Sequence, residues 1–203
     1  MDIFIVLVLL VFALRTLNVR DQRVRITLLG VHLGKYRIEK LMENLTQGYL
    51  RALGESDPQR QSAIWSMLSS AELELCEQFK AFVQEFSQVP ENQARVSKLL
   101  IALPYAAQWL ERFSFDARKV LSVHAHAISQ ATDNCQGQTP KNKAFTLMAE
   151  LFLMQHTCHW FCRSKLVASA RLLTRHQTSY AQVLDSVAPQ TRQAYCTLVG
   201  CRT

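Results

Sequence analysis

The chain has 203 residues, of which 49% are hydrophobic, and a formal net charge of +7 at neutral pH. This length allows one domain of ordinary size, and the apolar content excludes an intrinsically disordered chain. Only six glycines and five prolines interrupt it. Few helix-breaking residues, together with many Leu, Ala, Gln and Glu, predict an all-α fold.

The N-terminus carries the strongest signal in the sequence. Residues 3–14 are apolar without a break, and residues 1–17 as a helix would measure about 25 Å, enough for a thin bilayer. No basic stretch precedes this run and no small-x-small site follows it, which disfavours a cleaved secretory signal. We expect residues 1–17 to be an uncleaved membrane anchor. The alternative is the buried N-terminal helix of a soluble domain.

The charges beside the anchor predict its orientation. Arg15, Arg20, Arg23 and Arg25 follow the apolar run directly. The positive-inside rule then places the N-terminus outside a bacterial-type inner membrane and the rest of the chain in the cytoplasm. The same arginines can contact anionic lipid headgroups.

The cysteines provide a check on this orientation. Thiols stay free in a reducing cytoplasm, so a disulfide would count against a cytoplasmic domain. We expect all six to be free: Cys76, Cys135, Cys158, Cys162, Cys196 and Cys201.

The first half of the domain reads as a series of helices. Apolar residues recurring every seven positions predict a basic juxtamembrane helix over residues 18–53, with a break near Gly30 as an alternative. The helical bundle domain would follow over residues 54–203. Asp57 and Pro58 predict the next helix start, which a capping box at Ser69 would divide into residues 58–68 and 70–88. A further helix is expected over residues 92–113, with a kink at Pro104.

The second half continues the pattern. Residues 116–131 form an amphipathic helix, residues 133–142 form a loop, and Thr139–Pro140 opens a long helix that runs to about Arg175. Two short helices complete a multi-helix bundle, one ending at Val187 and one running from Pro189 to near Gly200. Residues 144–162 are apolar on nearly all sides, which favours the central helix of the bundle over a second membrane span.

One cluster of reactive side chains lies within that apolar stretch. Cys158 and Cys162 are four residues apart and His159 is three residues before Cys162, so a helix presents them within one turn of each other. With His124 from the preceding helix they could hold zinc or haem. Core packing explains the same residues, because cysteine behaves as a small hydrophobe. The usual zinc and haem motifs are missing, so we expect no cofactor and identify no catalytic residue.

The positive charge is concentrated in two blocks, residues 15–51 and residues 163–203. In the second block Arg171 and Arg175 lie at the end of the long helix, where they could contact lipid or an acidic partner. Aromatic residues do not alternate with these basic residues as they do in single-strand binders, so nucleic acid is not the expected ligand.

These features favour a binding protein over an enzyme. The leading hypothesis is a scaffold or assembly module that holds a protein partner, or a second copy of itself, at the membrane. One alternative is a metal- or haem-dependent sensor or enzyme that uses the Cys158, His159 and Cys162 cluster. The other is a membrane-tethered nucleic-acid binder that uses the C-terminal basic block.

Overall fold

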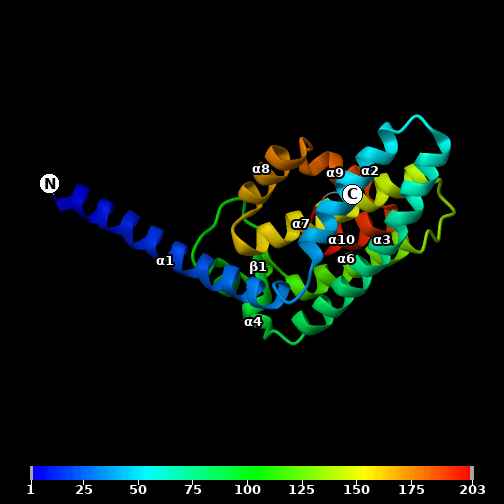
Figure 1. Cartoon of the computed structure of the whole chain (residues 1–203). Coiled ribbons are helices and arrows are strands. Elements are labelled where there is room, and N and C mark those ends of the chain that lie inside the picture. The colour runs from blue at the N-terminus through cyan, green and yellow to red at the C-terminus, as the bar shows by residue number, and fades with distance from the viewer. Residues whose placement is uncertain (1, 202–203) are drawn as a thin grey trace.

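The computed structural model describes residues 2–201, and the side chains of residues 3–201. The described chain is 79% helical, which confirms the all-α prediction, and one long helix extends out of a helical bundle (Figure 1). In chain order the elements are α1 (Asp2–Leu33), α2 (Ile38–Gly54), α3 (Pro58–Phe86), α4 (Glu91–Ala94), β1 (Arg95–Ser97), α5 (Ala106–Trp109), the 3-10 helix η1 (Glu111–Phe113), β2 (Ser114–Asp116), α6 (Ala117–Thr132), α7 (Pro140–Cys162), α8 (Lys165–His176), α9 (Tyr180–Ser186) and α10 (Pro189–Val199).

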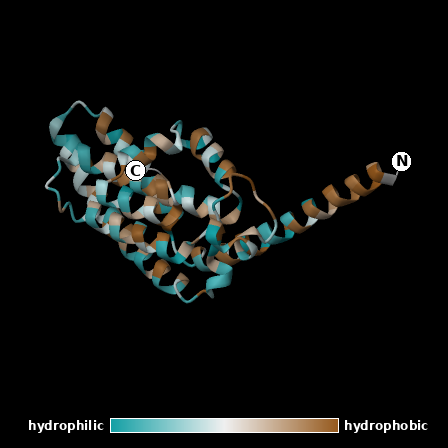
Figure 2. Ribbon diagram, turned by 180° about the vertical axis from the view of Figure 1, so that it is seen from behind, coloured by the Kyte–Doolittle hydropathy of each residue, from teal (hydrophilic) through white to brown (hydrophobic). Residues whose placement is uncertain are grey.

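Helix α1 is long and apolar enough to cross a membrane, and it is the only described helix that meets this condition. Its first half projects away from the bundle, and the apolar side chains of residues 3–12 are all exposed (Figure 2). Such a stretch of exposed apolar surface is unfavourable in water and is typical of a lipid-facing helix. The alternative of a buried N-terminal helix is therefore not what the structure adopts.

The helix continues without interruption through Gly30, and the chain turns only at residues 34–37. The predicted juxtamembrane helix is thus two helices, α1 and α2. Glu85 on α3 holds this corner. Its carboxylate accepts a hydrogen bond from Tyr36 Oη at 3.1 Å, pairs with His32 at 2.8 Å and pairs with Lys35. These contacts fix the angle between α1 and α2 against the bundle.

Helix α7 forms the centre of the bundle. Helices α2, α6, α8 and α9 and the second half of α1 pack around it. Its buried side chains include Leu147, Leu151, Met154 and Phe161. The apolar character of residues 144–162 therefore reflects burial on all sides within protein, as favoured from the sequence.

Helix α3 is continuous, so the predicted division at Ser69 is wrong. The Ser69 hydroxyl donates to the Trp65 carbonyl at 3.2 Å, one turn earlier. The capping-box partner, Glu72, is buried and instead accepts a hydrogen bond from Tyr49 Oη at 2.6 Å and pairs with Lys143. A Ser-x-x-Glu pattern within a helix was read as a helix start, because the partners of Glu72 lie far away in the sequence.

The predicted helix over residues 92–113 is also wrong. Strands β1 and β2 pair antiparallel, with Val96 opposite Phe115. Residues 98–105 form a loop that connects β1 to α5. Pro104 cannot donate a helical hydrogen bond, and Tyr105 has a left-handed φ of +56°. Trp160 on α7 donates to the Ser97 carbonyl at 2.9 Å, which fixes the ribbon to the core.

The long helix expected to run from Pro140 to Arg175 ends at Cys162 instead. The Ser164 side chain accepts from the Val167 amide at 3.3 Å and begins α8 as a separate helix. Asp57 and Thr139 cap helices as predicted from their positions, and Asp116 and Ser179 cap two further helices. Side-chain caps therefore mark helix starts at these positions, in contrast to Ser69.

Cys196 and Cys201 form a disulfide at the end of α10, with their Cα atoms 4.7 Å apart. The expectation of six free thiols is therefore wrong for this pair, because Gly200 directly follows α10 and its left-handed φ of +77° turns Cys201 back toward Cys196. The remaining four cysteines are free. The disulfide counts against a reducing location for the domain.

Candidate binding groove beside helix α1

An apolar hollow lies beside the second half of helix α1. A cavity of about 400 Å³ opens between α1 and α2 on one side and α7 and α8 on the other. Apolar side chains from three helices form its floor. They are Ile26, Leu29 and Leu33 of α1, Ile38 and Met42 of α2, and Met154, Cys158 and Cys162 of α7.

The hollow continues along α2. A second cavity of about 200 Å³ shares Glu39, Met42, Gln155 and Arg175 with the first and extends it to Thr46 and Phe152. We call the two together the anchor groove. Five residues of its α7–α8 wall are candidate site residues from the sequence: Cys158, His159, Cys162, Arg171 and Arg175. Sequence analysis did not identify α1 and α2 as the opposite wall, because that wall depends on the corner at residues 34–37.

Opposite charges line the two walls of the anchor groove. Arg163, Arg171 and Arg175 are exposed on the α7–α8 side, and Glu39 and Glu43 are exposed on the α2 side. Within residues 2–201 none of these five side chains forms an ion pair. Arg163 donates to Gln22, and Arg171 contacts His159 Nδ1 at 3.2 Å. The charges are thus available to a ligand.

The candidate metal residues are only partly brought together. Cys158, His159 and Cys162 line the anchor groove. Burial raises the pKa of the Cys158 thiol to about 12 and that of Cys162 to about 11, whereas metal binding needs the thiolate. Burial, reinforced by Arg171 and Arg175, lowers the pKa of His159 to about 4. These side chains are neutral at pH 7.

His124 lies apart from them. It is fully buried, its Nε2 atom is 2.9 Å from Thr157 Oγ1, and burial lowers its pKa to about 3. Over the described residues, no three His, Cys, Asp or Glu side chains form a group that could hold a metal ion. In the described residues, the only geometric support for zinc or haem binding is therefore that Cys158, His159 and Cys162 lie close together on α7.

The four arginines after the anchor differ in role. Arg15, Arg20 and Arg23 are exposed. Arg25 points into the domain: it pairs with Asp21 at 3.2 Å, donates to the Arg95 carbonyl at 2.8 Å and lies over the Phe161 ring at 5.6 Å. Arg25 thus attaches α1 to the bundle. The spacing of the arginines in the sequence does not distinguish this role from contact with lipid.

The C-terminal basic block is dispersed in the structure. Lys165 lies over the rings of Trp160 and Tyr180, at 5.1 and 4.9 Å from their centroids. Arg192 pairs with Asp185 at 3.0 Å. Arg202 lies outside the described residues. The remaining arginines of the block are those of the anchor groove, and they do not extend into the long basic stripe typical of nucleic-acid binders.

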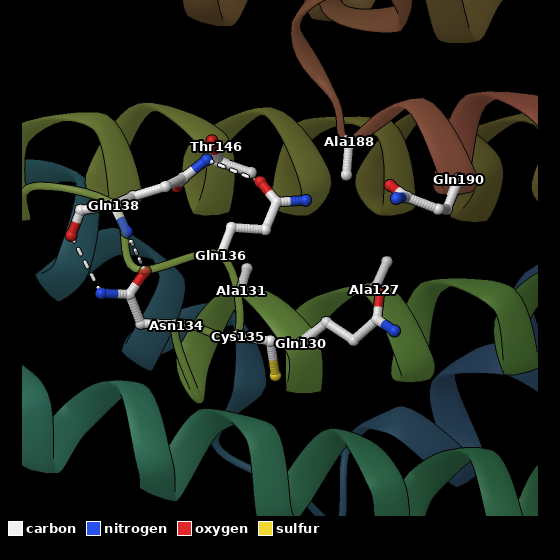
Figure 3. A pocket seen from close by; sticks show the side chains of 10 residues that line it. All are labelled: Ala127, Gln130, Ala131, Asn134, Cys135, Gln136, Gln138, Thr146, Ala188 and Gln190. Atoms are coloured by element: carbon white, nitrogen blue, oxygen red, sulfur yellow. Dashed lines mark hydrogen bonds between the residues drawn. The ribbon is translucent and has the colours of Figure 1, made fainter.

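A smaller hollow of about 150 Å³ lies at the start of α7, between α6 and α10 (Figure 3). Side-chain amides dominate its lining. Asn134 accepts from the Gln138 amide at 2.8 Å and donates to the Gln138 carbonyl at 2.9 Å, so these groups satisfy each other. None of its lining residues carries a charge, and the anchor groove is the stronger candidate.

Comparison of the chain with protein-family models, curated proteins and solved structures found no match.

Proposed function

We propose that this chain is a single-pass membrane protein whose helical domain holds a partner protein at the membrane. The anchor groove carries the proposal, because it combines an apolar floor with five charged side chains that have no ion-pair partner. Its apolar floor and charged rims suit an amphipathic helix that lies in a groove. Charges of both signs favour a peptide over a lipid chain, which offers no positive charge along its length.

The proposed orientation places the domain in the cytoplasm of a bacterial-type inner membrane. Its support is the three exposed arginines that follow the apolar half of α1. The disulfide between Cys196 and Cys201 is the observation against it.

A crosslinking experiment in cells tests the groove. A photoreactive amino acid at Glu43, on the rim of the anchor groove, is expected to give a discrete adduct with another protein, whereas one at Gln193 on the exposed side of α10 is not. Arg171→Ala with Arg175→Ala should reduce the Glu43 adduct about tenfold, because removing a charged partner from a contact costs 1.4 kcal/mol or more.

The matched control removes two positive charges elsewhere, with Arg51→Ala and Lys80→Ala, both exposed. This variant should keep the adduct. Equal loss of the Glu43 adduct in both double variants would show that only the net charge of the protein matters. The same adducts at Glu43 and at Gln193 would contradict the anchor groove as the binding surface.

A further inference from the structure

The loop between the two strands exposes an unusual amount of apolar surface. Residues 99–113 include α5 and η1, and six of their large apolar side chains are exposed: Leu100, Ile101, Leu103, Trp109, Leu110 and Phe113. Trp109 alone is 84% exposed. We call residues 99–113 the apolar loop. Single exposed apolar residues are common, but six in one short segment indicate a contact surface.

The apolar loop lies beside the point where α1 leaves the bundle. Its first half shares a small hollow with Asp21 and Arg25 of α1, and the Leu166 amide of α8 donates to the Leu100 carbonyl at 3.0 Å. Figure 2 shows this apolar stretch arching alongside α1 at the end of the bundle from which α1 projects. Asp21 is four residues, or about 6 Å, from the end of the expected membrane segment at Leu17.

We propose that the apolar loop inserts into the interfacial layer of the same membrane that α1 crosses. Proximity to α1 supports lipid over a protein partner, because the loop shares a hollow with Asp21 and Arg25, which follow the expected membrane segment by one to two helical turns. Arg112 within the loop and Arg20 next to Asp21 are exposed, and they suit anionic headgroups. Tryptophan is also enriched at membrane interfaces. The domain would then contact the bilayer at two places, with its orientation fixed.

The inference rests on α1 lying in the bilayer, as proposed above, and full-length protein reconstituted in liposomes tests it. The chain has three tryptophans. Emission that is present in the unchanged protein and lost in Trp109→Phe reports on Trp109. We expect phospholipids with brominated acyl chains to quench most of this component, and aqueous iodide to quench little of it.

Trp65→Phe is the matched control. Trp65 is on α3, and its ring centroid is 6.0 Å from that of Tyr49. The junction of α2 and α3, close to this residue in the sequence, lies at the opposite end of the bundle from the point where α1 projects (Figure 1). The component lost in this variant should be insensitive to brominated lipid.

Three results would overturn the inference or its premise. Quenching of the Trp109 component by iodide alone would place the loop in water. Protection from both quenchers would place it against protein, either a partner or a second copy. Loss of the whole protein from liposomes on alkaline extraction would instead contradict α1 as a membrane span, which separates failure of the proposed function from failure of this inference.

Discussion

The buried carboxyl group of Glu150 has few polar contacts. Glu150 on α7 is completely buried; its Oε1 atom accepts from the Ala188 amide at 3.0 Å, and its Oε2 atom has no hydrogen-bond partner. Burial raises the pKa of Glu150 to about 7 from an ordinary value of 4.5. The position of Glu150 in the sequence does not reveal its raised pKa, because its burial depends on the turn between α9 and α10, where Ala188 lies against α7.

The raised pKa of Glu150 predicts a dependence of stability on pH. Between pH 4.5 and 7 the unfolded chain releases this proton while the folded protein keeps it, so rising pH lowers the free energy of unfolding. The full penalty, about 3 kcal/mol, applies above pH 7. Part of this penalty is already present at pH 5, so Glu150→Gln should gain about 2.5 kcal/mol relative to the unchanged protein between pH 5 and pH 8, measured by denaturant unfolding in detergent.

Glu77→Gln provides the control for this measurement, because Glu77 is exposed on α3. Its difference from the unchanged protein should be the same at both pH values. A Glu150→Gln difference that is equally independent of pH would show that the carboxyl group titrates normally in the folded protein.

At the scale of helices, close packing of α2 on α3 depends on a small side chain. A Cβ atom added at Gly48 would lie 2.3 Å from Leu68 Cδ2, so Leu68 would have to move. We expect Gly48→Ala to destabilise the protein by about 1 kcal/mol or more, since overpacking costs 1–3 kcal/mol and exceeds the gain in helix propensity. Thermal unfolding in detergent measures the change.

Gly54→Ala in the same helix is the matched control, because a Cβ atom there would meet nothing within 4 Å. It should be neutral or stabilising. In a Leu68→Ala background the Gly48→Ala change should cost nothing, and a cost that persists there would contradict the proposed contact.

Helices could be predicted from the sequence where their ends carry local signals, and not where distant contacts decide. Asp57, Asp116 and Thr139 cap helices with their own side chains, so their positions were visible. The strand pair at residues 95–97 and 114–116 was missed because its periodicity resembles an apolar helix and its pairing partner is 19 residues away. Of the anchor groove, only the α7–α8 wall was visible, since the other wall is created by tertiary contacts of Glu85.

At the scale of the whole molecule, two features point to opposite sides of the membrane. Exposed Arg15, Arg20 and Arg23 favour a cytoplasmic domain, and the Cys196–Cys201 disulfide favours an oxidising compartment. Charge acts while the chain is being inserted, before α10 has folded and the two cysteines can meet. We therefore expect the arginines to determine the orientation.

Fusions at the C-terminus measure the orientation directly. A green fluorescent protein fusion should fluoresce and an alkaline phosphatase fusion should be inactive. A reducing cytoplasm would also open the Cys196–Cys201 disulfide, so both thiols should react in intact cells with a membrane-permeant thiol mass tag. Replacing Arg15, Arg20 and Arg23 with Gln should weaken this preference. An active phosphatase fusion with unreactive cysteines would place the domain outside.

Helix α1 runs unbroken from its exposed apolar half to the wall of the anchor groove at Leu33. Sixteen residues separate Leu33 from Leu17, about 24 Å, so a tilt of about 10° in a thinner bilayer would displace Leu33 by about 4 Å if the bundle stayed still. If the bundle tilts together with α1, the anchor groove turns toward or away from the membrane plane. If the bundle does not tilt with α1, the width of the anchor groove changes. Partner affinity would then respond to bilayer thickness.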